Sequence, residues 1–193
     1  CPAIADHLAE RCGPAHWIGY SLGGRIALHV ALTHPESVHS LVLIGATAGI
    51  EDPSARERRR QLDLERAAEV EQLGVAEFTG RWLAMDMFAG LPERAHFISE
   101  RLTNTSAGLA GSLRNAGTGS MEPLWENLRD LQMPVLLLSG ERDASFTETA
   151  VRMDALIGDN AMALTVPGAG HAAHLEAPEP TLGLILEHLI SLR

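Results

Sequence analysis

The chain has 193 residues, of which 46% are hydrophobic and 21% charged, a composition typical of one substantial globular domain. Its formal net charge of -10 argues against binding to nucleic acid or to an anionic membrane surface. The spacing of Cys1 and Cys12 fits neither a metal site nor a redox motif, which favours a reducing compartment. We find no apolar run long enough to span a bilayer and no recognisable signal peptide, so we predict a cytoplasmic protein.

Helix and strand patterns alternate over the first fifty residues. They predict a helix over residues 4–12, a strand ending at Gly19, a helix from Ser21 to about His34 and a strand over residues 40–44. The second strand is apolar without alternation, which is typical of a strand buried on both faces. This order predicts parallel βαβ architecture, with functional loops at the carboxyl ends of the strands.

The pattern changes at residue 51, where a charged stretch without strand patterns begins. Four helices are predicted in this stretch, over residues 56–73, 75–88, 92–103 and 107–116. The α/β pattern then resumes with strands over residues 133–139 and 161–166 and helices over residues 147–157 and 181–192. We therefore predict α/β core segments at residues 1–50 and 128–193, interrupted by a helical lid at residues 51–127.

A glycine-flanked serine lies between the first predicted strand and the helix that follows it. The run Gly19-Tyr20-Ser21-Leu22-Gly23 is typical of a nucleophile elbow, in which a sharp turn strains the serine backbone and exposes its hydroxyl. We expect side chains at Gly19 and Gly23 to collide across this bend, and the Leu22 N–H to point toward whatever Ser21 contacts. The alternative is a glycine-rich connection with an incidental serine.

Three candidate catalytic residues follow three different predicted strands: Ser21, Asp143 and His171. In such a set the imidazole takes the serine proton, and the carboxylate fixes the tautomer of the imidazole. Alternatively, Asp143 caps the next helix, His171 is a solvated turn residue, and Glu141 competes as the acid. His171 and His174 lie three residues apart, but no third ligand has suitable spacing, so no metal site is predicted. His174 is assigned either a structural role or a supporting role next to the catalytic residues.

Arg25 lies in the first turn of the predicted helix, where the helix dipole disfavours a positive charge. Its side chain leans back toward the helix N-terminus and is long enough to reach the site. We interpret it as an anion-binding residue; the alternative is a salt bridge to the lid. Residues 56–60, rich in arginine, are typical of a solvated helix face, although one of these arginines could also reach the site.

The chain resembles the α/β-hydrolase superfamily and, more narrowly, the 2-succinyl-6-hydroxy-2,4-cyclohexadiene-1-carboxylate synthases, the pyruvate-eliminating lyases of menaquinone biosynthesis. The matching stretches are residues 19–25, 41–49, Arg59-Arg60 with Asp63, Phe78 with Trp82, and residues 109–125, 133–143 and 168–176. Within them, Ser-Leu-Arg-Asn-Ala-Gly-Thr-Gly-Ser at 112–120 is more specific than the elbow, which many hydrolases share.

The resemblance implies a catalytic triad of Ser21, Asp143 and His171. It also implies a pocket for a small polycarboxylate substrate, to which Tyr20, Leu22, Arg25, Arg59, Trp82 and Arg101 contribute. By resemblance, the serine, deprotonated by His171, takes a ring proton from 2-succinyl-5-enolpyruvyl-6-hydroxy-3-cyclohexene-1-carboxylate, and pyruvate leaves without an acyl-enzyme. Neither a metal nor an organic cofactor is implied.

Two other functions stay open, a carboxylic-ester or carbon–carbon-bond hydrolase that uses Ser21 as nucleophile, and an inactive binding module. Hydrolases of this superfamily normally have several strands before the elbow strand, whereas one short helix precedes it here. The sequence therefore resembles the C-terminal part of such a fold, either a fragment or a natural truncation. We expect four parallel strands with the elbow strand as an unpaired edge, and a chain that is inactive and poorly soluble alone. The sequence does not predict an oligomeric state.

Overall fold

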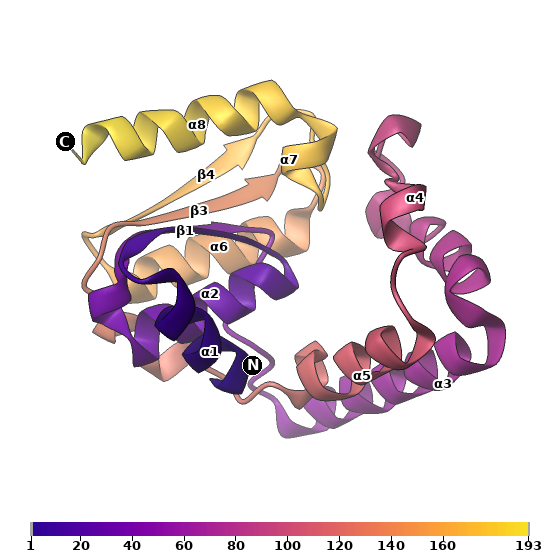
Figure 1. The fold of residues 1–193 in the computed structure, drawn as a ribbon. Coiled ribbons are helices and arrows are strands. Elements are labelled where there is room, and N and C mark those ends of the chain that lie inside the picture. The colour runs from indigo at the N-terminus through magenta and orange to yellow at the C-terminus, as the bar shows by residue number, and fades with distance from the viewer. Residues whose placement is uncertain (1, 193) are drawn as a thin grey trace. The chain divides into compact units, whose positions relative to one another are not determined.

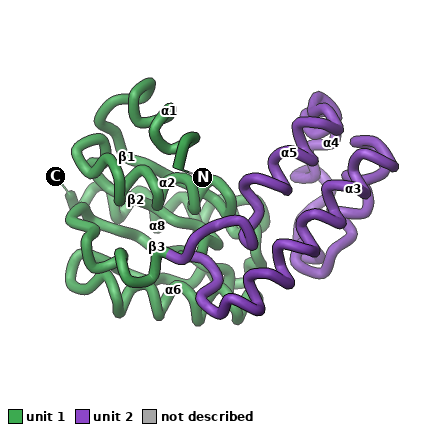
Figure 2. The backbone as a smooth tube through the Cα atoms, turned by 90° about the horizontal axis from the view of Figure 1, so that it is seen from below, with its two compact units in different colours: residues 1–48, 124–193 green, residues 49–123 purple. Residues whose placement is uncertain are grey.

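The computed structural model describes residues 2–192, and the chain divides into two compact units (Figure 2). The first unit combines residues 1–48 with residues 124–193, and the second is residues 49–123. The boundaries thus differ from the predicted lid at 51–127. Residues 124–127 belong to the first unit because Trp125 is part of the hydrophobic core of that unit.

A four-stranded parallel sheet forms the centre of the first unit (Figure 1). Its strands are β1 (Ala15–Tyr20), β2 (Val38–Ile44), β3 (Val135–Gly140) and β4 (Ala161–Val166), in the spatial order β1-β2-β3-β4. Ile18 lies beside Val42, and Val42 beside Leu136, so the carboxyl ends of the strands meet at one edge of the sheet. This confirms the predicted α/β class. Within residues 2–192, β1 pairs with β2 alone and has no strand on its other side.

Helices cover both faces of this sheet. One face carries α1 (Pro2–Cys12), α2 (Leu22–Thr33) and α6 (Ala144–Ile157), and the other carries α7 (Ala173–Glu176) and α8 (Pro178–Ser191) (Figure 1). Leu41 and Leu43 of β2 pack on the α2 side, whereas Val42 and Ile44 pack on the α8 side. β2 is therefore buried on both faces, which explains its unbroken apolar sequence. The short helix α7 was not predicted.

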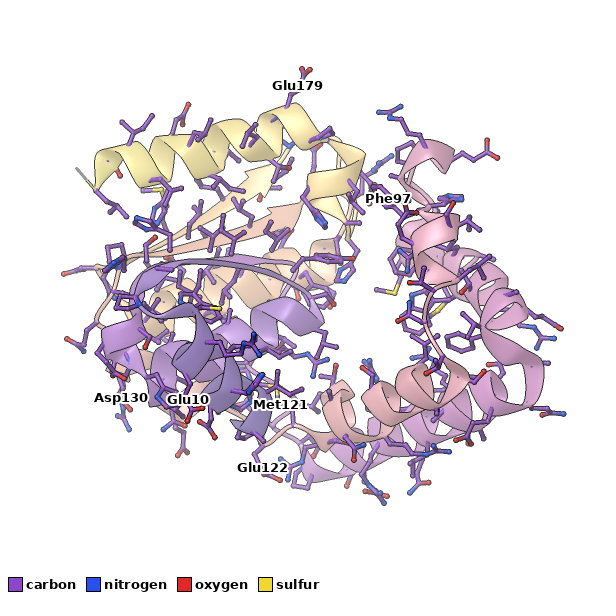
Figure 3. All side chains as sticks on the ribbon, in the orientation of Figure 1. Glu10, Phe97, Met121, Glu122, Asp130 and Glu179 are labelled. Atoms are coloured by element: carbon purple, nitrogen blue, oxygen red, sulfur yellow. The ribbon has the colours of Figure 1, made fainter. Side chains whose placement is uncertain are left out.

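The second unit is helical. It contains α3 (Pro53–Leu83), α4 (Ile98–Arg101), α5 (Ser106–Ala116) and the 3-10 helices Asp86–Phe88, Glu93–Ala95 and Thr118–Ser120. Gly74, with φ 81° and ψ 168°, breaks α3 where the sequence predicted the gap between two helices. The helix predicted over 92–103 is wrong, because Phe97 (labelled in Figure 3) has φ 47° and separates a 3-10 turn from the four residues of α4.

A small core and one buried carboxylate hold the helical unit together. Val70, Phe78 and Ala110 pack between α3 and α5. Asp63 is buried, and its carboxylate accepts hydrogen bonds from Arg59 Nε at 2.9 Å and from the Gly119 N–H at 3.3 Å. These bonds fasten the glycine-rich segment after α5 to α3. No helix within residues 2–192 is both long enough and apolar enough to cross a membrane.

Burial of His29 in α2 makes the stability of the protein depend on pH. His29 is 6% exposed, and burial lowers its pKa from 6.5 to about 4, with a further lowering from the charge of Arg25. The unfolded chain therefore binds a proton in a pH range where the folded protein does not. We expect the free energy of unfolding to be unaffected by His29 above pH 6.5 and to fall by up to about 3 kcal/mol as the pH decreases toward 4.

Urea unfolding of the parent and of His29→Gln at pH 7 and pH 4.5 measures this dependence. Burial also lowers the pKa values of His174 and His188, so the contribution of His29 is the difference between the two pH slopes. The glutamine variant should lose less stability on acidification than the parent, whatever its stability at pH 7. Equal slopes would show that His29 does not carry the effect.

Candidate active site

Ser21 lies in the turn between β1 and α2 with a strained backbone, at φ 49° and ψ -109°. Within the described part of the chain, Ser21 and Phe97 are the non-glycine residues with positive φ. Two hydrogen bonds hold the turn, from Ser21 N–H to the Ile44 carbonyl at 2.9 Å and from Arg25 N–H to the Ser21 carbonyl at 3.0 Å. The local conformation is therefore that of the predicted nucleophile elbow.

Close backbone packing at the elbow involves two glycines. A Cβ on Gly19 would lie 2.5 Å from the Gly23 carbonyl oxygen, and a Cβ on Gly24 would lie 2.6 Å from the Ala46 Cβ. A Cβ on Gly23 would meet nothing within 4 Å. The expected steric need for glycine at position 23 is therefore wrong. The close approach occurs at Gly24 instead, where the first turn of α2 packs against the end of β1 and the loop after β2.

The three candidate catalytic side chains meet at the carboxyl edge of the sheet. His171 Nδ1 lies 2.8 Å from Asp143 Oδ2, and His171 Nε2 lies 3.4 Å from Ser21 Oγ. The His171 side chain is 2% exposed and that of Asp143 17%. Asp143 also caps α6, because its other oxygen accepts from the Phe146 N–H at 3.4 Å. The two interpretations of Asp143, catalytic acid and helix cap, are thus compatible.

Aromatic rings enclose the imidazole of His171. The Tyr20 ring lies 5.4 Å from it and the Phe146 ring 4.5 Å, between ring centroids. Gly45, with φ 53°, leaves room for His171, since a Cβ there would lie 3.2 Å from its Cε1. Sequence reasoning missed Phe146, although its place three residues after Asp143 in the first turn of the next helix was a usable signal.

His174 packs behind Tyr20, with the two ring centroids 4.5 Å apart. Burial lowers the pKa of His174, and the nearby imidazole of His171 lowers it further. A neutral ring at this position fits the structural role assigned from the sequence. Within residues 2–192, no three His, Cys, Asp or Glu side chains are grouped so that they could hold a metal ion.

The competing acid, Glu141, makes a different contact. Its carboxylate accepts a hydrogen bond from the Gly168 N–H at 2.7 Å, in the loop that leads to His171. Asp143, rather than Glu141, therefore contacts the imidazole. Of the predicted substrate-binding residues of the first unit, Leu22 begins α2, Tyr20 ends β1, and Arg25 is buried one turn after Ser21.

The other predicted substrate-binding residues belong to the helical unit. Arg59 donates through Nε to Asp63, and Arg101 donates through Nε to the His96 carbonyl at 2.8 Å. Trp82 stacks on Phe78 with ring centroids 5.8 Å apart, and the Arg66 guanidinium lies 5.5 Å from its centroid. Arg59 and Arg101 thus each have their Nε held by a partner within the helical unit.

Comparison with known proteins identifies the family. The sequence profile described as "Alpha/beta hydrolase family" matches residues 2–183, and the chain belongs to this family. A Bacillus subtilis (strain 168) protein that provisionally carries the name 2-succinyl-6-hydroxy-2,4-cyclohexadiene-1-carboxylate synthase is 34% identical over 180 residues. That alignment covers 91% of this chain and 65% of the Bacillus protein, so the chain spans less than two thirds of that relative.

Two further matches bear on function. The solved structure of MenH from S. aureus superposes with a TM-score of 0.90 at 30% identity, covering 98% of this chain and 73% of that one. The pimeloyl-(acyl-carrier protein) methyl ester esterase of Xanthomonas campestris pv. campestris (strain B100) is 33% identical over 181 residues, covering 90% of this chain and 70% of the esterase. These comparisons confirm the resemblance drawn from the sequence, and they also include an esterase.

The two neighbouring glycines of the elbow give a matched test of its packing. We expect Gly24→Ala to lower the free energy of unfolding by about 2 kcal/mol, because its Cβ would overlap the Ala46 side chain. Gly23→Ala should be neutral or raise stability by up to about 1 kcal/mol, because alanine favours the helix and its Cβ meets open space. Chemical denaturation of the two variants measures the difference. A larger loss in Gly23→Ala would contradict the packing described here.

Proposed function

We propose that the protein is a carbon–oxygen lyase of menaquinone biosynthesis. It would eliminate pyruvate from 2-succinyl-5-enolpyruvyl-6-hydroxy-3-cyclohexene-1-carboxylate to give 2-succinyl-6-hydroxy-2,4-cyclohexadiene-1-carboxylate. The observation that carries the proposal is the chain of contacts from Asp143 through His171 to Ser21, at 2.8 and 3.4 Å. The likeness to a Bacillus subtilis protein that carries the synthase name supports the choice of reaction.

In the proposed mechanism, Ser21 is the base. Asp143 accepts the Nδ1–H of His171, which leaves Nε2 free to take the Ser21 hydroxyl proton. The serine oxygen removes a ring proton of the substrate, and the released electron pair forms the new ring double bond. The carbon–oxygen bond to the enolpyruvyl group then breaks, and the leaving group takes up a proton to become pyruvate. No acyl-enzyme, metal or organic cofactor takes part.

Burial of the catalytic imidazole suits proton transfer. The His171 side chain is 2% exposed and packs against the Tyr20 and Phe146 rings, so water is largely excluded from it. The contact between Nε2 and Ser21 Oγ is long for a hydrogen bond, as in many enzymes whose catalytic bonds shorten when substrate binds. In this mechanism, the low local dielectric strengthens the attraction between the imidazolium and Asp143 during the reaction.

Arginines are the groups that we propose bind the carboxylates of the substrate. Arg25 is placed one turn after Ser21 and is the candidate on the α/β unit. Arg59, Arg101 and Trp82 are the candidates on the helical unit. Arg59 uses Nε for Asp63, and within residues 2–192 its terminal nitrogens make no hydrogen bond, so its planar fork is available to a carboxylate.

A serine hydrolase is the second candidate, and the 33% identity to a methyl ester esterase favours it. The same three residues would then act differently: Ser21 would attack an ester carbonyl and form an acyl-enzyme that water cleaves. The geometry of the three side chains serves both reactions equally, so the assay must separate them by product.

The test joins the chain to an N-terminal segment that supplies the strands expected before β1, because the chain alone is expected to be inactive. This protein is given the enolpyruvyl substrate, and pyruvate release is measured by coupling it to lactate dehydrogenase. We expect pyruvate release without a covalent intermediate, and Ser21→Ala and His171→Ala to lower kcat by about 1,000-fold or more. Ester cleavage with an acylated Ser21, detected by mass spectrometry, and no pyruvate would establish the hydrolase instead. If neither activity is detected, the inactive binding module is the function that remains.

Substitution of Arg25 tests carboxylate binding. We expect Arg25→Ala to lower kcat/KM by about 30-fold, equivalent to about 2 kcal/mol of transition-state binding. Arg25→Lys should recover little, because lysine lacks the bidentate fork. Arg11→Ala, at an exposed position near the end of α1, is the matched control and should react like the parent. Parent-like kinetics in both Arg25 variants would assign this buried arginine a structural role.

A further inference from the structure

Glu176, at the end of α7, has a buried carboxylate that the proposed mechanism does not use. Its side chain is 1% exposed. A buried carboxylate is costly unless donors surround it, and three donors do so here. Gly170 N–H lies 2.8 Å from Oε2, Ala172 N–H lies 3.2 Å from Oε1, and Arg142 Nη2 lies 3.0 Å from Oε2.

The two backbone donors belong to the residues immediately before and after His171. One carboxylate therefore holds the chain on both sides of the catalytic imidazole, with a separate oxygen for each side. Gly170 is suited to this approach, because a Cβ there would lie 2.9 Å from Oε1 and 3.0 Å from Oε2. The backbone on each side of His171 is thus fixed, and the direction of its side chain follows from that backbone.

Arg142 connects this carboxylate to the loop that carries Asp143. Its guanidinium donates to Glu176, and its backbone N–H donates to the Ala169 carbonyl at 2.8 Å. Since Asp143 is the next residue, the acid loop and the histidine loop are joined on both sides of the contact between His171 and Asp143. A shift of one loop would be transmitted to the other.

We propose that Glu176 is a positioning residue for His171, and that Arg142 couples it to the Asp143 loop. Glu176 touches neither the reacting hydroxyl nor the imidazole; it acts through the two peptide N–H groups that flank His171. Displacement of a catalytic group by about 1 Å can cost on the order of 100-fold in rate. The inference rests on the use of Ser21 and His171 in the proposed function, and it holds for a lyase and for a hydrolase alike.

Glu176→Gln is the main test and Glu141→Gln its matched control. Glutamine keeps the shape of the side chain but turns one acceptor into an NH2 group, which faces a peptide N–H and cannot bind it. Glu141 likewise accepts from a peptide N–H of the same loop, at Gly168, but three residues before His171. A loss of loop stability alone would affect both variants, whereas a loss of imidazole positioning would affect Glu176→Gln.

Two readouts follow His171 without depending on the natural substrate. The first is the rate at which a p-nitrophenyl alkylphosphonate labels Ser21: His171 takes the hydroxyl proton, the oxygen–phosphorus bond forms and p-nitrophenolate leaves. The second is the downfield proton NMR resonance of the Nδ1–H between His171 and Asp143. If the parent released no pyruvate, the proposed function would fail separately, and both readouts would still report on positioning.

We expect Glu176→Gln to label about 10- to 100-fold more slowly and to shift or broaden the His171 resonance. Its kcat for pyruvate release should fall by a similar factor, with KM within about threefold of the parent. Glu141→Gln should keep the parent's labelling rate and resonance. The proposal is overturned if Glu176→Gln keeps both, or if the two variants lose them equally.

Arg142→Gln covers the case in which Glu176→Gln does not fold. The Arg142 side chain is 56% exposed, so this variant leaves the core intact. It removes the charged donor that joins the two loops, whereas the hydrogen bonds from the Gly170 and Ala172 N–H groups to Glu176 stay in place. We expect labelling to slow by about threefold and the His171 resonance to shift. An unchanged rate and resonance would overturn the coupling through Arg142 and, with it, the proposal.

Discussion

The close approach of β1 to the first turn of α2 determines where the candidate nucleophile lies. Gly19 and Gly24 lack side chains where the two backbones cross, and the Ser21 N–H bonds to the end of β2. The strained conformation of Ser21 is maintained because packing on both sides leaves the turn no room to relax. Every other part of the site, including the loops after β3 and β4, must be placed relative to this hydroxyl.

Three carboxylates hold different parts of the loops after β3 and β4. Asp143 contacts the His171 ring, Glu176 holds the peptide groups on both sides of His171, and Glu141 holds Gly168 earlier in the loop. Each accepts hydrogen bonds from a different part of one loop, and burial increases from Glu141 to Glu176. The His171 ring, the backbone on both sides of it and the start of its loop at Gly168 are thus fixed by separate hydrogen bonds.

Local signals predict the elements, and tertiary contacts decide the details. The apolar run of β2 and the break at Gly74 are local features, and both are found where the sequence places them. The steric role predicted for Gly23 belongs instead to Gly24, for which no steric role was predicted, because its close neighbour Ala46 lies in the loop after β2. The helix predicted over 92–103 fails at Phe97, whose left-handed conformation no propensity predicts. The environment of Glu176 is equally non-local, since its donor Arg142 lies 34 residues away.

The geometry of Ser21, His171 and Asp143 does not by itself select a reaction. A serine oxygen that has lost its proton can take a proton from carbon or attack a carbonyl, and the same imidazole serves both steps. What separates the two outcomes is the pose of the substrate: a ring held by its carboxylates presents a C–H bond to Ser21, whereas an ester presents a carbonyl. Arginines suited to bidentate binding can hold such a pose without touching the reacting atoms. Arg25, one turn after Ser21, is such an arginine, and specificity set there would leave Ser21, His171 and Asp143 the same for both reactions.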